Sequence, residues 1–170
     1  MEFKKGTFRQ DELEVASSTG SIYVVTRSAA IKAAREAIFD LLSSPSRHHL
    51  FDGSGTVLAE LEGPEKLYLN AKFRMSMRRS AIRYRIWNTV VEFDEPTVIA
   101  WRHVGRHVWR FELEDISSEF GPATRVTESF EWGNVHSKFL YEVLKYPAQN
   151  GRAIEATLEK LAELASNGQL

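Results

Sequence analysis

Residues Ile99–Leu113 read IAWRHVGRHVWRFEL, and this stretch predicts a β-hairpin. A three-residue loop at 104–106 would place similar side chains opposite each other, in the pairs Ile99–Phe111, Trp101–Trp109 and His103–His107. The large apolar side chains and both histidines then share one face. A two-residue loop would put arginines opposite tryptophans instead, because a register slip of one residue turns every side chain to the other face. We therefore expect the three-residue loop.

The sequence on either side of this hairpin predicts more antiparallel strands, preceded by short helices. The expected elements are a strand from Ser21, helices at Ala33–Ser43 and Ser46–Phe51, and strands at 67–78, 82–93, 98–103, 107–116 and 123–132. Apolar alternation changes parity within the strand at 82–93, which predicts a β-bulge near Trp87-Asn88. The strands therefore form a meander with one apolar face.

Apolar residues recur at spacings of three and four from 139 to 165, which predicts a C-terminal helix. Asn134 is the expected N-cap, and Pro147 should divide the segment into a short helix and a longer one. The longer part would span about 27 Å, enough to cross a sheet. This order predicts an α+β domain over 21–166, with the helices on one face of the sheet, and an N-terminal arm at 1–20. A space between sheet and helix is a favourable place for a ligand.

Several segments follow, in order and spacing, the pattern of a known family: Ala37–Leu42, Asp52–Gly55, Val90–Pro96, Ile99–His103, Trp109–Leu113 and Thr124–Phe130. Together they resemble the polyketide cyclase/dehydrase branch of the SRPBCC (START-like, helix-grip) superfamily, over about residues 21–165. The resemblance implies a curved seven-stranded sheet wrapped around the C-terminal helix, with a hydrophobic cavity between them. The superfamily includes lipid carriers, hormone receptors, aromatase/cyclases, quinone-binding proteins and chaperone co-factors, so the resemblance does not fix the function.

Composition excludes several kinds of chemistry. The 170 residues favour one domain, and the absence of cysteine excludes disulfides, thiolate nucleophiles and cysteine–zinc sites. No apolar run is long enough to span a membrane, and residues 1–14 are charged without the apolar core of a signal peptide, so the cytoplasm is the expected location. Phosphate-loop, dinucleotide-binding and metalloprotease motifs are missing from the sequence, so we expect no cofactor and no metal.

Candidate site residues come from the inward face of the predicted sheet and helix. Glu128 shares a face with apolar residues, and a carboxyl group in a cavity must be paired or have a raised pKa. Glu128 and His103 are therefore the candidate catalytic acid and base. The expected ligand contacts are Phe73, Met75, Tyr84, Asn88, Trp101, Trp109, Phe111, Phe130, Trp132, Phe139 and Val143. Alternatively, the aromatic rings are ordinary core, His103 is a solvated loop residue, and Glu128 is wet or paired with an arginine.

Three functions fit these patterns. The first is binding of an apolar small molecule, such as a lipid, a polyketide or an aromatic precursor. The second is a cyclase or dehydratase that uses acid/base chemistry in the same cavity. The third is a protein interaction through the outer sheet face, because residues 71–110 carry nine basic and three acidic side chains. An acidic protein partner could dock on Arg74, Arg78, Arg79, Arg83 and Arg85, although a solvated face is the alternative. No nucleic-acid motif accompanies the charge, and the oligomeric state stays open.

Overall fold

The computed structural model describes residues 23–170; the predicted arm at 1–20 and the start of the first strand lie outside the described residues. The elements, in chain order, are β1 (Val24–Ile31), α1 (Arg35–Leu42), η2 (Pro45–Arg47), α2 (His48–Phe51), β2 (Val57–Glu62), β3 (Lys72–Arg79), β4 (Ile82–Asp94), β5 (Val98–His103), β6 (Val108–Asp115), β7 (Thr124–Glu131), α3 (Lys138–Val143) and α4 (Tyr146–Ser166). The predicted order of a strand, short helices, a meander and a long helix is confirmed.

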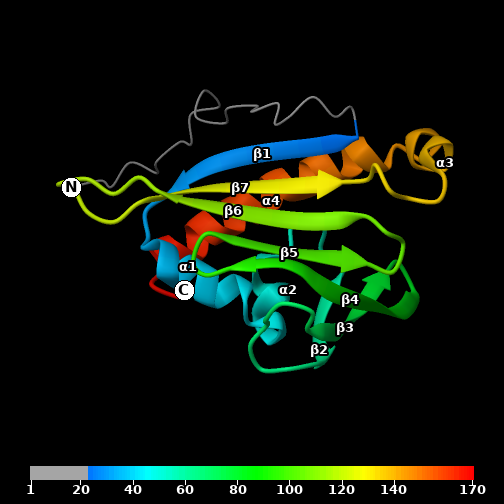
Figure 1. The fold of residues 1–170 in the computed structure, drawn as a ribbon, viewed down its shortest axis with the longest axis horizontal. Coiled ribbons are helices and arrows are strands. Elements are labelled where there is room, and N and C mark those ends of the chain that lie inside the picture. The colour runs from blue at the N-terminus through cyan, green and yellow to red at the C-terminus, as the bar shows by residue number, and fades with distance from the viewer. Residues whose placement is uncertain (1–22) are drawn as a thin grey trace.

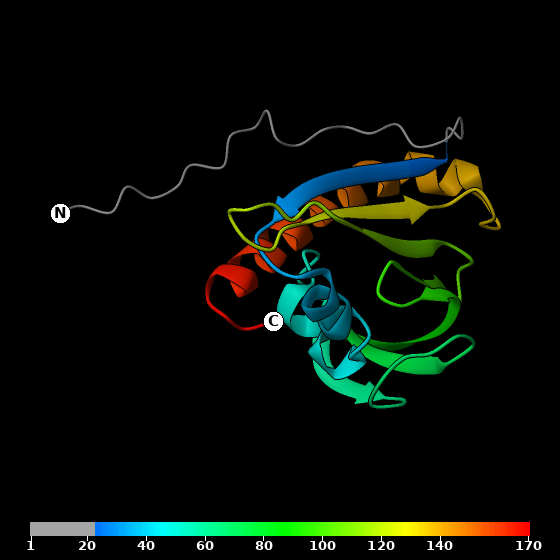
Figure 2. The ribbon, with the colours of Figure 1, turned by 60° about the vertical axis from the view of Figure 1, so that its left-hand side comes forward.

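All the strands form one antiparallel sheet in the order β1-β7-β6-β5-β4-β3-β2. The sheet is strongly curved, and α4 lies against β1 and β7 on its concave side (Figure 1). Helices α1 and α2 occupy the other part of the same concave side (Figure 2). This is the α+β helix-grip fold that the sequence predicts.

The core lies between this concave face and the helices. In α4, Ile154, Leu158 and Leu161 recur at spacings of four and three and are almost fully buried against the sheet. Each such side chain contributes about 1.5–3 kcal/mol through the apolar surface it removes from water. In α1, Ile38 and Leu42 bury the equivalent stripe. The spacing of apolar residues in the two helices therefore fixes which side faces the sheet.

The β5–β6 hairpin has the predicted register. Trp101 pairs with Trp109 across the two strands, and the His103 N–H donates to the carbonyl of His107 at 2.9 Å. Arg106, in the loop, adopts the left-handed conformation with φ of 70°. The rings of His103 and His107 stack with centroids 4.2 Å apart. Sorting side chains by face is therefore sufficient to find the loop length.

Three details of the strands differ from the predictions. β3 begins at Lys72 instead of residue 67, because Asn70 turns the chain with φ of 69°. The residue pattern gives no bounds for the edge strand β2, although the resemblance implies a seventh strand. The bulge lies between Val90 and Glu92, so Val90 is fully buried and Val91 is 39% exposed. The sequence misplaces the bulge because Asn88 is an inward-facing polar residue and not a break in the apolar face.

The C-terminal segment divides into a short and a long helix as predicted, but at a different residue. Lys145 is left-handed with φ of 56° and separates α3 from α4. Pro147 lies in the first turn of α4, where a missing N–H costs no helical hydrogen bond. The cap of α3 is Ser137 and not Asn134: its hydroxyl accepts the N–H of Leu140 at 3.2 Å. Within residues 23–170, no helix is both long and apolar enough to cross a membrane.

Candidate functional site

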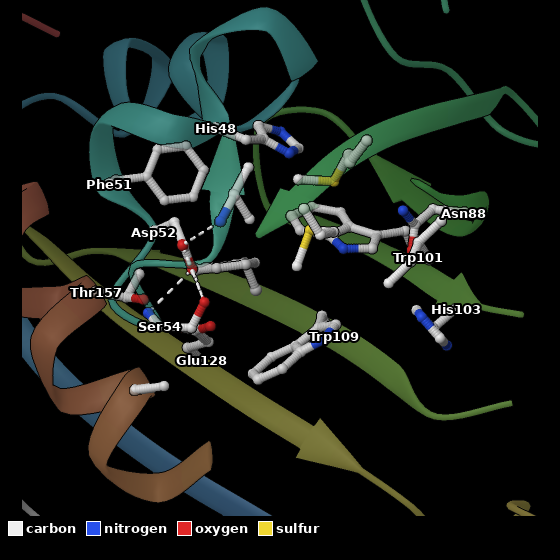
Figure 3. A pocket seen from close by; sticks show the side chains of 16 residues that line it. His48, Phe51, Asp52, Ser54, Asn88, Trp101, His103, Trp109, Glu128 and Thr157 are labelled. Atoms are coloured by element: carbon white, nitrogen blue, oxygen red, sulfur yellow. Dashed lines mark hydrogen bonds between the residues drawn. The ribbon is translucent and has the colours of Figure 1, made fainter. Parts of the chain in front are cut away.

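A cavity of about 110 Å³ lies between the sheet, α2 and α4 (Figure 3). Its apolar wall consists of Phe51, Val57, Met75, Met77, Ile86, Trp101, Trp109, Phe111 and Ala153. Its polar members are His48, Asp52, Ser54, Asn88, His103, Glu128 and Thr157. Ser54 is exposed, so the cavity reaches the surface beside the loop that follows α2.

The cavity brings together seven of the residues predicted from the sequence. They are Met75, Asn88, Trp101, His103, Trp109, Phe111 and Glu128. They converge because they lie on the inward face of β3 to β7, and each follows the alternation of its strand. Their roles in binding or catalysis stay predictions.

The other six predicted contacts lie outside the cavity lining. Phe73, Phe130 and Trp132 are buried in the core, where their rings pack against other aromatic side chains. Tyr84 is exposed and does not line the cavity. Phe139 is 74% exposed and Val143 is 58% exposed, because the turn at Lys145 carries α3 away from the sheet. The structure therefore places these six residues outside the lining of this cavity, and their role as ligand contacts stays a prediction.

Nine lining residues were not among the predicted contacts: His48, Phe51, Asp52, Ser54, Val57, Met77, Ile86, Ala153 and Thr157. Met77 and Ile86 share the predicted apolar faces of their strands and could have been included. Thr157 is a polar residue within the apolar stripe of α4, which is a usable signal. The residues of α2 and the following loop carry no such pattern, since tertiary packing alone brings them to the cavity.

Glu128 is the most unusual group in the cavity. It lies on β7 opposite Phe111, its residue is only 4% exposed, and its Oε2 atom has no hydrogen-bond partner among the described residues. Burial raises the pKa of Glu128 well above its ordinary value of 4.5, and the nearby negative charge of Asp52 raises it further. Arg27 is opposite Glu128 on β1 but pairs with Glu155 of α4 at 2.8 Å. Burial therefore favours the protonated, neutral form of the Glu128 carboxyl group.

Asp52 closes the same end of the cavity and is held by its own loop. Its carboxylate accepts the N–H groups of Ser54, Thr56 and Val57 at 2.9–3.0 Å. The next residue, Gly53, donates its N–H to Thr157 of α4 at 3.0 Å and approaches so closely that a Cβ there would lie 2.0 Å from a backbone oxygen of the helix. Glycine is required at this contact, and the loop is fixed against α4.

His103 and Asn88 form the other end of the cavity and lie directly opposite each other on β5 and β4. The Nδ1 atom of His103 accepts the N–H of Gly105 at 2.7 Å, so in the neutral ring Nε2 carries the proton. Burial lowers the pKa of His103 to about 4. Burial, and then the neighbouring His103, lowers the pKa of His107 to about 3. This end therefore presents an uncharged imidazole and an amide.

His48 lies deeper, on α2, where its ring stacks on Trp101 with centroids 4.9 Å apart. Its Nε2 atom is 2.7 Å from the carbonyl of Leu42, which can only accept, so Nε2 donates. Nδ1 is then an acceptor, and it has no partner among the described residues. Burial lowers the pKa of His48 to about 4, so this ring is also neutral at pH 7.

The two predicted catalytic residues do not converge. Glu128 and Ile99 both face Phe111, from β7 and β5, whereas His103 lies four residues farther along β5. Four residues of strand span about 13 Å, so the two side chains occupy opposite ends of the cavity. Within residues 23–170, no three histidine, aspartate or glutamate side chains cluster in a way that could hold a metal ion.

The predicted basic face is partly neutralised. Arg74 pairs with Glu62 and lies over the ring of Trp87, and Arg83 is 3.9 Å from Glu60. Arg78 lies directly opposite Arg83 across β3 and β4. Positive charge therefore remains concentrated at Arg78 and Arg83. Like charges that face each other across a sheet are destabilising.

Comparison with protein-family models finds no family that matches the chain. Two sequence relatives come from Mycobacterium tuberculosis: uncharacterized protein Rv0088 of strain H37Rv is 35% identical over 150 residues, and uncharacterized protein MT0096 of strain CDC 1551 is 34% identical over 150. Each match covers 85% of this chain and 65% of the relative. The chain thus spans less than two thirds of the length of these proteins.

Solved structures share the fold at low sequence identity. The AHSA1-like protein from Aeromonas hydrophila has a TM-score of 0.60 and 15% identity, over 86% of this chain and 95% of that one. Protein Ms6760 from Mycobacterium smegmatis has a TM-score of 0.62 and 14% identity, over 86% and 92%. The Aha1 dimer from Colwellia psychrerythraea has a TM-score of 0.57 and 16% identity, over 86% and 98%. The protein therefore shares the helix-grip fold of these structures.

Proposed function

We propose that the protein binds a small, largely apolar molecule in the cavity between the sheet and α4. The observation that carries this proposal is the wall of the cavity, where Trp101, Trp109 and Phe111 lie between polar groups at both ends. Apolar pockets with a few convergent polar groups are the usual form of small-molecule sites. The helix-grip fold supports the proposal because it leaves such a space between sheet and helix.

The size of the cavity limits what can bind without movement. Its volume of about 110 Å³ is near the roughly 150 Å³ of an engineered cavity that holds benzene, and below the roughly 300–1,000 Å³ of drug-sized sites. A one-ring molecule therefore requires little adjustment, whereas a lipid or polyketide requires side chains to move. Met75 and Met77 suit such movement, because unbranched thioether chains repack easily.

Titration with ethylbenzene, followed by two-dimensional NMR of the labelled protein, tests this proposal. We expect saturable shifts at residues that line the cavity. Ile86→Trp should fill the cavity and abolish them, whereas Trp87→Phe should not, because Trp87 is the next residue on β4 but faces outward. Folding of Ile86→Trp is checked by its spectrum, since overpacking costs about 1–3 kcal/mol. Absence of saturable shifts, or their persistence in Ile86→Trp, would contradict the proposal.

A second candidate function is a cyclase or dehydratase of the polyketide type. One observation favours it: Glu128 is a buried acid that could protonate a substrate hydroxyl group as it leaves as water, after which its carboxylate would take the proton from the neighbouring carbon. Because His103 lies at the opposite end, it would position substrate and not share the proton transfer. If wild-type protein turns over a poly-β-keto substrate and Glu128→Gln loses the turnover while keeping ethylbenzene affinity, this function is supported. Equal turnover by both proteins would exclude Glu128 as the acid.

A third candidate is an acidic protein partner on the outer sheet face. The opposed pair Arg78 and Arg83 favours it, because like charges facing each other destabilise the sheet and Glu60, 3.9 Å from Arg83, is a single negative charge beside two positive ones. Reversal of both charges should abolish binding of such a partner and leave ethylbenzene binding unchanged. Binding that does not weaken with salt would argue against a charged interface.

A further inference from the structure

We infer that the Glu128 end of the cavity recognises an uncharged carbonyl oxygen of an aromatic ligand, and that the cavity rejects carboxylates. This inference rests on the proposed function and gives the chemical class of its ligand. It follows from three features of the cavity: the charges of the side chains in its wall, the Oε2 atom of Glu128 without a hydrogen-bond partner among the described residues, and the hydrogen bonds that the Asp52 carboxylate already accepts.

The charges of the wall exclude an anion. Among the described residues, no lysine or arginine lines the cavity, while two carboxyl side chains do. Arg27 is on the same face of the sheet as Glu128 but is engaged with Glu155, and the Lys160 ammonium group donates to the backbone carbonyl of Asp52 at 2.6 Å. A ligand carboxylate would therefore be buried beside Asp52 without a positive partner, which is strongly unfavourable.

The protonated carboxyl group of Glu128 requires a hydrogen-bond acceptor for its O–H group. Oε2 is buried and has no hydrogen-bond partner among the described residues, and the protonated form that burial favours has an O–H group to donate. Asp52 does not serve as this acceptor, because its carboxylate already takes three backbone N–H groups and the hydroxyl of Ser54 at 2.7 Å. A carbonyl oxygen of the ligand would satisfy the proton of Glu128 without bringing a second charge into the site.

The aromatic part of the ligand follows from what adjoins Glu128. Phe111 lies directly opposite it on β6, and Trp109 follows along the same face. Figure 3 shows Glu128 and Trp109 directed into the same space, with Asp52 and Ser54 beside the carboxyl group. A ring placed against Trp109 would therefore leave a carbonyl substituent within reach of Glu128 and away from the imidazole of His103.

Four one-ring probes of similar size test the inference at pH 7: ethylbenzene, acetophenone, benzoate and benzylammonium. We compare the affinity ratio of acetophenone to ethylbenzene in wild type with that in Glu128→Leu. Loss of one hydrogen bond to a buried group should lower this ratio about five- to tenfold. Glu128→Gln, whose amide also donates, should retain it, and Glu131→Gln on the outer face of β7 is the control. Benzoate should bind at least tenfold more weakly than acetophenone.

The pH dependence gives a second readout. Acetophenone affinity in wild type should fall as pH rises through the pKa of Glu128, because the donor proton is lost, and should stay flat in Glu128→Gln. The charged groups nearby, Asp52, Arg27, Glu155 and Lys160, are present in both proteins, so their effects cancel in this comparison.

The outcomes separate this inference from the proposed function. If ethylbenzene binds and the ratio is unchanged in Glu128→Leu, the cavity binds ligands but Glu128 does not select a carbonyl. If benzylammonium binds most tightly and loses its affinity in Glu128→Gln, the site takes a cation through an ionised carboxylate, and the inference is wrong. Tight benzoate binding also overturns it. If no probe binds, both proposals fail.

Discussion

The two ends of the cavity hold titratable groups of opposite kinds, and burial favours the neutral form of each. It raises the pKa of Glu128 well above 4.5 and lowers the pKa of His103 from 6.5 to about 4. An imidazole is already largely uncharged at pH 7, so His103 costs little stability there. A carboxyl group would be ionised in the unfolded chain at pH 7, so keeping Glu128 protonated makes folding less favourable.

The ends also differ in how their polar atoms are satisfied. At the hairpin end, His103 accepts a backbone N–H, and Nδ1 of His107 lies 3.0 Å from the hydroxyl of Tyr141. At the α4 end, Oε2 of Glu128 has no partner within the described chain. Buried polar groups without partners are rare in folded proteins and require an explanation. This difference supports the proposal that a ligand binds at the Glu128 end, whereas the polar groups of the hairpin end hydrogen-bond within the protein.

The largest expected effect on stability comes from truncating the tryptophan side chains that line the cavity between its two ends. Trp101→Ala should destabilise the protein by about 3–5 kcal/mol, because the buried indole packs between His48 and Phe111 and leaves a void. Trp109→Ala should cost less, since this half-buried ring already borders open space. Urea unfolding of both variants measures the difference. Equal losses would mean that Trp109 is core and not cavity wall.

Lowering the pH should destabilise the hairpin end. The pKa of His107 is about 3 in the folded protein and 6.5 ordinarily, so only the unfolded chain takes up this proton between those values. Its contribution to stability is present above pH 6.5 and is lost as pH falls towards 3. At pH 4, His107→Gln should reduce the acid-dependent loss by about 2–3 kcal/mol. The control is His136→Gln, because His136 is exposed. Urea unfolding at neutral pH and at pH 4 measures the loss of unfolding free energy, and an equal loss in both variants would contradict the prediction.

Raising the pH should destabilise the Glu128 end. Because the pKa of Glu128 is raised, the folded protein holds a proton that the unfolded chain releases above about pH 4.5, and stability falls as pH increases. Glu128→Gln should therefore be more stable than wild type by about 1–3 kcal/mol at pH 8 and equal to it at pH 4. Thermal unfolding at both pH values measures this, with Glu131→Gln as the control. A variant less stable at pH 8 would show that Glu128 has an internal partner.

Much of the fold follows from periodicity, because strands and helices must sort their side chains by face. The β5–β6 register is an example: a single loop length puts Trp101 opposite Trp109 and keeps arginines off the inner face. The prediction of Glu128 as a buried carboxyl group uses the same alternation on β7. Inward-facing strand residues are thus within reach of sequence reasoning.

The rest of the site depends on contacts that periodicity does not encode. Asp52 reaches the cavity because Gly53 allows its loop to touch α4, a contact between segments about a hundred residues apart. Phe139 and Val143 match the helical stripe, yet the left-handed residue Lys145 turns their helix outward. The left-handed residue Lys145 therefore removes two predicted contacts from the cavity, and the contact of Gly53 with α4 adds Asp52, which was not predicted.

The smallest expected effect concerns the attachment of α3 to the hairpin end. None of its residues is buried, and the ring of Tyr141 stacks on Trp132 with planes 6° apart while its hydroxyl meets His107. Tyr141→Phe keeps the stacking and removes the hydrogen bond, which is worth about 0.5–1.5 kcal/mol and corresponds to a two- to tenfold rise in local opening. Hydrogen exchange should therefore accelerate two- to tenfold at 138–144 and stay unchanged at 154–161. Ethylbenzene affinity should not change, because α3 contributes nothing to the cavity lining. Faster exchange along α4 as well, or weaker binding, would show that the hairpin end is coupled to the ligand site and is not only structural.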